Sequence, residues 1–284
     1  MALNLQIYRG REIDVIQKLE GIDGGKAFDW GRASTDYAKY RDIYPEEFYR
    51  RMIEMGLCVE GQRVLDLGTG TGVLPRNLYK YGAKFTGVDV AENQIREAGR
   101  LSREQNMDME YLVSPVEEVD FPDETFDVIT ACQCFMYFDK AVILPKVYKM
   151  LKAGGRFCIM FMAYLPDEDE IAKASEELVL KYNPSWTGAG WRRSGITEPD
   201  WAPPLFTMDK AEAFDIMLPF TRESWHGRIK ACRGIGASSL PPEVIAAFEK
   251  EHIAMVSRCS ESFKILHYVT IQSFVKSPAR INPI

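Results

Sequence analysis

The architecture of this chain follows from one run of nine residues, Val64-Leu65-Asp66-Leu67-Gly68-Thr69-Gly70-Thr71-Gly72. A strand is expected to end at Leu67, where a glycine-rich turn begins, and helical spacing starts at Val73. Glycine in such a turn permits backbone dihedrals and close approaches that a β-carbon would forbid. The order of strand, glycine turn and helix predicts that a ligand lies against the backbone, at the carboxyl end of the strands.

Short apolar runs alternate with helical stretches from residue 62 to about 165. The expected strands are Arg63–Leu67, Lys84–Val90, Met109–Val113, Phe126–Ala131 and Arg156–Ala163, with helices over Val73–Tyr81 and Glu92–Gln105 between them. Nearly continuous apolar character suits strands that are buried on both faces. The alternation therefore predicts an α/β fold with a doubly wound parallel sheet.

The flanking segments show fewer elements. Helices are expected over Glu46–Met55 and Asp167–Tyr182, the second opening on a charged and solvated first turn, Asp167 to Glu170. Ser238 or Ser239 can cap a further helix whose first turn holds Pro241 and Pro242, and alternation predicts a last strand over Phe263–Val275.

Charge and composition restrict the partners. The 284 residues include 35 Lys and Arg against 41 Asp and Glu, a net charge of −6 that disfavours nucleic acid. The longest apolar run, Phe157–Leu165, is too short to span a bilayer, and Arg9, Arg11 and Glu12 interrupt the region a signal peptide would occupy. We expect a cytoplasmic protein without a membrane partner.

The six cysteines form no CxxC motif. Cys132 and Cys134 would share one face of a strand and could in principle bind a metal. No histidine or acidic cluster of ligand spacing accompanies them, so buried, reduced thiols and no metal site are expected.

Asp89 follows Gly72 by seventeen residues, at the end of the second strand, where an acid can accept hydrogen bonds from both hydroxyls of a ribose. Dinucleotide-binding folds usually show GxGxxG. Here the spacing is GxGxG, Val73 stands where the third glycine of GxGxxG would fall, and Asp66 precedes the first glycine by two positions.

That arrangement resembles motif I of the class I S-adenosylmethionine-dependent methyltransferases. Three later segments resemble the same family in the same order: Phe85–Val90, Val116–Ile129 and Leu151–Phe157. The resemblance implies a Rossmann-like, mostly parallel seven-stranded sheet, with a helical N-terminal cap and an inserted cap after the fifth strand. It implies one methyltransferase domain over residues 1–284, divided into an N-terminal cap (1–60), a cofactor-binding core (61–165), an inserted cap or substrate segment (166–230), and a C-terminal helix and last strand (231–284).

The resemblance also implies S-adenosylmethionine as cofactor and a set of residues that bind it. They are Asp66, Gly68, Thr69, Gly70, Gly72, Asp89, Val90, Val116, Glu117 and Gln133. Asp66 and the glycine turn would receive the methionine part, Asp89 the ribose hydroxyls and Val90 the adenine. Pro115 stands where many relatives place an Asp that accepts from the adenine amino group.

Two further segments resemble small-molecule methyltransferases of the trans-aconitate type. Gln133–Asp139 is similar to their QxFHWFD stretch, with Met136 in place of His and Tyr137 in place of Trp. Tyr37–Pro45 is similar to a YxxxRPxYP segment that folds over the cofactor, which implies Tyr37 and Arg41 as contacts. Ordinary packing of these aromatic residues is the equal alternative.

Methyl transfer from a sulfonium is an in-line displacement, and a general base is required only when the nucleophile must lose a proton. His226 and Tyr137 are the candidates, whereas His252 and His267 are expected to be packed or solvent-facing. Trp186, Trp191, Trp201 and Phe206 would cover an apolar acceptor or form the small core of the insertion. Arg192 and Arg193 would attract an anionic acceptor or be surface pairs.

Three functions remain open at this stage. The first is methylation of a small molecule at O, N, S or C. The second is a non-catalytic regulatory module that binds S-adenosylmethionine or a related nucleoside, which Pro115 and Met136 keep open. The third, an NAD-dependent oxidoreductase, is disfavoured by GxGxG with Val73. The acceptor and the oligomeric state stay undefined.

Overall fold

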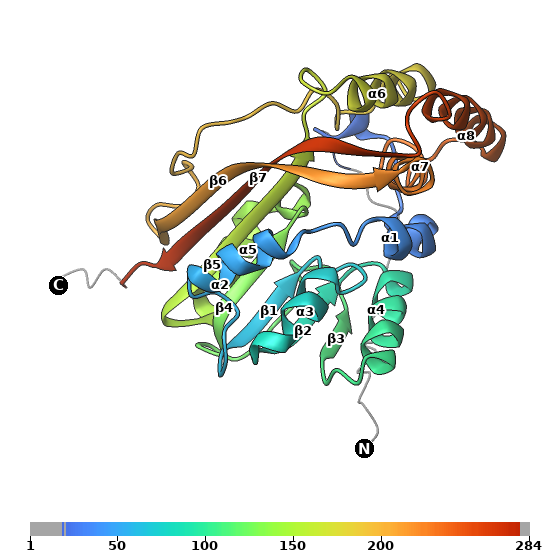
Figure 1. Cartoon of the computed structure of the whole chain (residues 1–284). Helices are drawn as coiled ribbons and strands as arrows, with labels where there is room; N and C mark the ends of the chain where they lie inside the picture. The colour runs from blue at the N-terminus through green and yellow to red at the C-terminus, as the bar shows by residue number, and fades with distance from the viewer. Residues whose placement is uncertain (1–18, 20, 279–284) are drawn as a thin grey trace.

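The computed structural model describes residues 19 and 21–278, which form one seven-stranded sheet (Figure 1). The strands are β1 (Arg63–Leu67), β2 (Lys84–Asp89), β3 (Glu110–Val113), β4 (Phe126–Cys132), β5 (Leu151–Tyr164), β6 (Phe206–Thr221) and β7 (Ser262–Lys276). Their order is β3-β2-β1-β4-β5-β7-β6. β1 to β5 pair in parallel, and β7 is antiparallel to both β5 and β6. The predicted doubly wound, mostly parallel sheet is confirmed.

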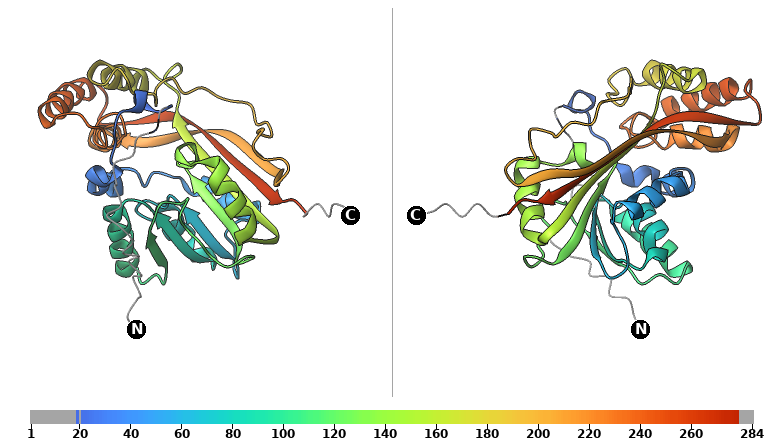
Figure 2. Two further views of the ribbon diagram at one scale, coloured as in Figure 1. Left: turned by 180° about the vertical axis from the view of Figure 1, so that it is seen from behind. Right: turned by 60° about the vertical axis from the view of Figure 1, so that its left-hand side comes forward.

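Helices flank the sheet and gather at one end of it. They are α1 (Ser34–Tyr40), α2 (Glu46–Glu54), α3 (Val73–Leu78), α4 (Glu92–Glu104), α5 (Lys140–Met150), α6 (Glu170–Tyr182), α7 (Arg222–Lys230) and α8 (Pro242–Val256). α7 packs on α1 and α8, and α6 also packs on α8. Figure 2 shows α6, α7 and α8 grouped at one end of the long β6–β7 pair, away from α3 and α4.

The alternation of side chains along β1 builds a core on each face of the sheet. Val64 joins a cluster with residues of α2, α3 and α4, whereas Leu65 and Leu67 join a second cluster with residues of α5. All three side chains are fully buried. The near-continuous apolar character of this strand therefore reflects helices on both faces, as the sequence predicts.

The inserted segment differs from its expectation. Residues 206–221, placed in that segment by sequence, form β6 of the main sheet. β6 is an edge strand, and Lys210, Glu212 and Asp215 break its apolar alternation, so its sequence lacks a clear strand pattern. α7 also lies in this segment, where Trp225 and Ile229 are too few to reveal helical spacing. Within residues 166–230, α6 and the loop from Asn183 to Leu205 are thus the parts that lie outside β6 and α7.

The acidic run before α6 has structural partners. Asp169 caps the helix by accepting hydrogen bonds from the backbone N–H groups of Ile171 and Ala172, at 3.1 and 3.0 Å. Asp167 pairs with Arg192 at 2.7 Å, and Arg193 pairs with Glu168 and Asp215. The two arginines are thus surface pairs, one of the two roles expected for them. The helix begins at Glu170, three residues later than predicted.

The tryptophans divide between core and cavity. Trp201 packs on Phe135, Phe157 and Phe274, and Phe206 is buried in the same cluster, so these two residues belong to the core. Trp186 belongs to the other buried cluster and also lines the large cavity described below, as does Trp191. The inserted loop therefore contributes to both core and cavity.

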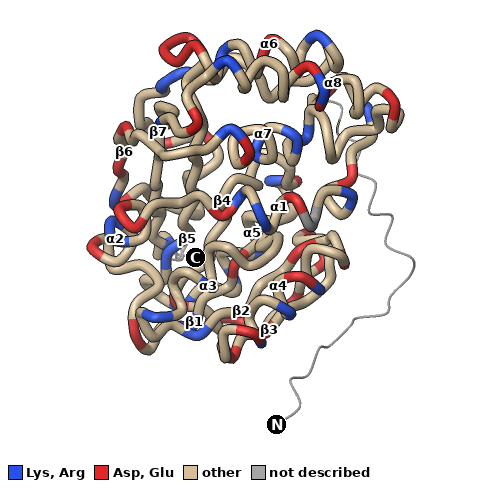
Figure 3. Tube along the Cα trace, turned by 45° about the vertical axis from the view of Figure 1, so that its right-hand side comes forward, with Lys and Arg blue, Asp and Glu red and all other residues tan. Residues whose placement is uncertain are grey.

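Within the described residues, no helix is both long and apolar enough to cross a bilayer. Arg9, Arg11 and Glu12, on which the prediction about a signal peptide rests, lie outside the described residues. Figure 3 shows basic and acidic residues interleaved along the trace.

Two buried histidines predict a loss of stability in mild acid. His252 and His267 are fully buried, and burial lowers the pKa of each to about 3. Below a pH of about 6.5 the unfolded chain binds protons that the folded chain does not, so the free energy of unfolding falls with pH down to about 3. At about pH 5.5 each histidine costs roughly 1–1.5 kcal/mol relative to about pH 7.5.

Urea unfolding at these two pH values measures this effect. The double variant His252→Gln/His267→Gln is expected to lose roughly 2–3 kcal/mol less than the wild type on acidification. An equal loss in both proteins would assign the acid sensitivity to other groups.

Candidate functional site

A cavity of about 880 Å³ opens at the carboxyl ends of the parallel strands. Its walls come from the turn after β1, the ends of β2, β4 and β5, and residues of α1 and α7. The order of the sheet reverses between β1 and β4, where doubly wound folds bind ligands. Its size is that of a small-molecule site.

The glycine turn needs glycine where it borders the cavity. Gly68 has a φ of 65°, and a β-carbon there would lie 2.8 Å from both Cβ and Sγ of Cys134. The Cys134 thiol donates a hydrogen bond to the Leu67 carbonyl at 3.0 Å, which holds the strand after β4 against the turn. Both the left-handed backbone and this close approach exclude a side chain.

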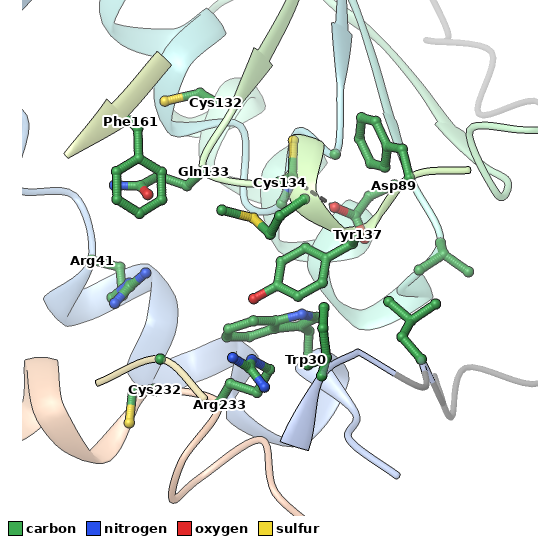
Figure 4. Close-up of a pocket in the computed structure, with 18 of the residues that line it drawn as sticks. Trp30, Arg41, Asp89, Cys132, Gln133, Cys134, Tyr137, Phe161, Cys232 and Arg233 are labelled. Carbon is green, nitrogen blue, oxygen red and sulfur yellow. Dashed lines mark hydrogen bonds between the residues drawn. The ribbon is translucent and has the colours of Figure 1, made fainter. Parts of the chain in front are cut away.

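Asp89 connects the glycine turn to the cavity (Figure 4). Its Oδ2 accepts a hydrogen bond from the Gly70 N–H and its Oδ1 accepts one from the Ala91 N–H, both at 2.9 Å. Burial raises the pKa of Asp89, while these backbone hydrogen bonds oppose the rise. A carboxylate oxygen has two lone pairs, so each oxygen can still accept a hydroxyl.

Asp66, Thr69 and Gly72 lie beneath the turn and do not line the cavity. Asp66 is 2% exposed and accepts a hydrogen bond from the Thr130 hydroxyl at 2.6 Å, and burial raises its pKa to about 6. The Thr69 N–H donates to the Val88 carbonyl, and Gly72 precedes α3 with a φ of 71°. These residues support the turn without facing a ligand.

Val90, Val116 and Glu117 line one end of the cavity together with Pro115. The Glu117 carboxylate accepts a hydrogen bond from the Asp139 N–H at 2.9 Å and thereby closes this end. Pro115 offers neither an N–H nor a side-chain acceptor, so a base placed here would contact Val90 and Val116 mainly through apolar surface.

Arg41 and Phe161 lie at the opposite end, with Tyr137 and Trp30 between them and Asp89 (Figure 4). The Arg41 guanidinium lies 5.0 Å from the ring centroid of Tyr37, which also lines the cavity. Gln133 lines it from the end of β4, where its backbone has a φ of 64° and its Nε2 donates to the Met162 carbonyl at 2.5 Å.

The two catalytic candidates differ in position. Tyr137 lines the cavity, but burial raises its pKa, which keeps the hydroxyl protonated at neutral pH. His226 does not line it; its Nδ1 lies 2.9 Å from Nδ1 of His252, on the far side of α7 from the cavity-lining Arg228. No histidine is present among the described residues that line the cavity.

Cys132 and Cys134 serve separate contacts rather than a common ligand. The Cys132 thiol donates to the Tyr44 hydroxyl at 3.4 Å, and burial raises the pKa of Cys132 to about 12. All six cysteines are free thiols. Among the residues that the structure describes, no three His, Cys, Asp or Glu side chains are grouped so as to hold a metal.

Several lining residues carry no sequence signal. Trp30, Gln94, Arg228 and Arg233 reach the cavity from segments that are distant along the chain. Arg233 pairs with Asp23 and lies 5.8 Å from the ring centroid of Tyr137. A prediction of α7 would have been needed to place Arg228, because its role depends on which face of that helix meets the cavity.

Comparison with known proteins finds similarity to methyltransferases in the central region. Residues 65–159 match the model of a methyltransferase domain. A ubiquinone biosynthesis O-methyltransferase of Bradyrhizobium diazoefficiens is 30% identical over 148 residues, which cover 52% of this chain and 58% of that protein. The corresponding protein of Pseudomonas entomophila is 27% identical over 175 residues, covering 61% of this chain and 72% of that protein.

A solved structure supports the same fold. The YcgJ protein of Bacillus subtilis superposes with a TM-score of 0.51 at 21% identity, covering 81% of this chain and 98% of that one. The curated relatives align over part of their length, and the chain spans little more than half of the Bradyrhizobium protein. The expected resemblance is thus confirmed for the central region and the fold.

Proposed function

We propose that the chain transfers a methyl group from S-adenosylmethionine to a small-molecule acceptor, because residues 65–159 match the model of a methyltransferase domain. The observation that carries the proposal is the position of Asp89. Its carboxylate accepts a hydrogen bond from the Gly70 N–H at the switch point of the sheet, and its remaining lone pairs can accept hydroxyls of a ligand in the 880 Å³ cavity.

The cavity residues fit the cofactor. Gly68 and Gly70 present bare backbone that a side chain would block, and Asp89 offers acceptors for two ribose hydroxyls. Val90 and Val116 provide an apolar surface for adenine, and Arg41 provides a cation for the methionine carboxylate. Tyr37 packs against that cation, and Gln133 lines the same cavity. When bound, the cofactor supplies an activated methyl group on a sulfonium.

The protein's own contribution is orientation and exclusion of water. Tyr137, Trp30 and Phe161 wall the middle and far end of the cavity with aromatic surface, and α7 covers it. Holding two reactants in line can supply about 7–11 kcal/mol relative to their free encounter. No histidine reaches the cavity from the described residues, so the arrangement suits a nucleophile that need not lose a proton at neutral pH, such as a carboxylate.

A binding module without catalysis is the second candidate. The observation in its favour is the same lack of a histidine base among the described lining residues, together with Pro115 at the adenine end. Turnover separates the two candidates: an enzyme releases S-adenosylhomocysteine when an acceptor is supplied, whereas a regulatory module retains the cofactor unchanged.

Thermal melting with S-adenosylmethionine, S-adenosylhomocysteine and NAD tests the cofactor. A ligand at 100 times its Kd adds about 2.7 kcal/mol, which raises the midpoint by about 5–10 °C for a protein of this size. We expect that shift with the first two ligands and none with NAD. Absence of a shift with either sulfur ligand at millimolar concentration would contradict the proposal, and a shift with NAD alone would indicate an oxidoreductase.

The finer predictions remain predictions. A substrate of the trans-aconitate type, a cytoplasmic location, and the lack of nucleic-acid and membrane partners rest on the sequence patterns alone.

A further inference from the structure

Arg228 is a buried cation that has no ionic partner among the described residues. Its side chain extends from α7 into the lining of the cavity and is 6% exposed. It forms no ion pair or side-chain hydrogen bond with any described residue, and its Nε is buried without a hydrogen-bond partner. Removing a guanidinium from water without pairing it costs several kcal/mol, so such groups in proteins normally have an anion beside them.

Arg41 places a second unpaired guanidinium at the same end of the cavity. It too forms no ion pair among the described residues, and the uncharged ring of Tyr37 lies against it. Burial, followed by the positive charge of Arg41, lowers the pKa of Arg228 to about 10, so both groups remain charged at neutral pH. Two adjacent cations make this end of the cavity strongly attractive to anions.

Among the described residues, no acid neutralises the pair. Asp89 and Glu117 line the opposite end, where each accepts from backbone amides. Arg233 also lines the cavity, but it forms an ion pair with Asp23, so its charge has a partner within the protein. The buried acid of α6, Glu176, accepts from the Gly190 N–H and forms no ion pair with Arg228.

The cofactor can neutralise the charge of only one of the two cations. Its methionine part carries a single carboxylate, which the proposed function assigns to Arg41. Given that function, we propose that Arg228 binds an acidic group, a carboxylate or a phosphate, on the methyl acceptor itself. The acceptor is thus an anion rather than a neutral or cationic molecule.

The surroundings of Arg228 indicate the rest of the acceptor. Phe161 and Trp191 pack with ring centroids 4.0 Å apart and ring planes tilted by 30°, and both line the cavity. Tyr164 lies close enough to Arg228 to influence its pKa, and its ring is a third aromatic surface in the cavity lining. Flat apolar surface beside a cation suits an acceptor whose acidic group is attached to an aromatic or other apolar body.

Binding of small anions to the protein loaded with S-adenosylhomocysteine tests this inference. Benzoate and phenyl phosphate represent the two acidic groups, and benzamide and phenol are their uncharged counterparts. We expect at least one anion at tens of millimolar to raise the melting midpoint, while its uncharged counterpart does not. Arg228→Gln is expected to weaken that anion roughly 10- to 100-fold, the effect of losing a hydrogen bond to a charged group.

Two matched variants serve as controls. Lys230→Gln removes the same charge from α7 at a position outside the cavity, where Lys230 pairs with Asp36 and Glu249, and is expected to bind the anion like the wild type. Arg228→Lys retains the charge but not the planar fork, so it should bind with intermediate affinity and report whether the Gln variant fails for structural reasons.

The affinity for S-adenosylhomocysteine, measured first in every variant, separates this inference from the proposed function. If the wild-type protein does not bind S-adenosylhomocysteine, the proposed function is wrong. Intact binding of S-adenosylhomocysteine without stabilisation by either anion, or with equal anion affinity in wild type and Arg228→Gln, would overturn the assignment of Arg228 alone.

Discussion

Asp89→Ala is expected to weaken binding of S-adenosylhomocysteine by roughly 10²–10⁴-fold. The carboxylate is proposed to accept two ribose hydroxyls, and each hydrogen bond to a charged group contributes about 1.5–3 kcal/mol. The substitution also removes the acceptor for the Gly70 and Ala91 amides, so the glycine turn loses one of its fixed points. Both effects are confined to the side of the turn that faces the cavity, so the packing of the hydrophobic core is expected to stay unchanged.

Isothermal titration calorimetry measures this loss directly. Asp123→Ala is the control, because it removes an exposed acid from the turn before β4, outside the cavity. Asp89→Asn keeps one acceptor oxygen and is expected to fall between wild type and the alanine variant. If the alanine variant, folded by circular dichroism, binds within threefold of the wild type, Asp89 does not hold the ribose.

Gly72→Ala is expected to destabilise the protein by roughly 2–5 kcal/mol. The φ of Gly72 is 71°, a left-handed conformation that costs an L-residue about 1–2 kcal/mol. A β-carbon there would also lie 2.5 Å from the Tyr111 hydroxyl, and such overpacking costs about 1–3 kcal/mol more. Gly72 is therefore required for packing of α3 on the sheet, although it does not line the cavity.

Gly154→Ala isolates the backbone contribution. Gly154 has nearly the same φ, 72°, but no described residue other than its chain neighbours lies within 4 Å of the position that a β-carbon would take there, so only the conformational cost should appear. Urea unfolding of both variants, and of Gly72→Ala/Tyr111→Phe, separates strain from overlap. The packing argument fails if Gly72→Ala loses no more stability than Gly154→Ala, or if removing the Tyr111 hydroxyl recovers nothing.

The sequence alone was sufficient for the parallel core. The apolar runs of β1, β2 and β4 are local patterns, and burial on both faces demands them wherever the strands lie. The glycine turn and Asp89 were equally readable, because a left-handed backbone and an acid at a strand end are requirements of single positions. The edge strand β6 could not be predicted from the sequence, because only one of its faces packs against the protein and charged residues interrupt its apolar alternation.

Tertiary structure decided which side chains share the cavity. Asp66 belongs to the same motif as Gly68, yet strand alternation turns it beneath the turn toward Thr130. His226 faces His252 instead of the cavity. Arg228, two residues later on the same helix, faces Arg41, which stands at the end of α1. These outcomes depend on the angle at which α7 meets α1. Contacts between segments nearly two hundred residues apart set that angle, and no local pattern encodes it.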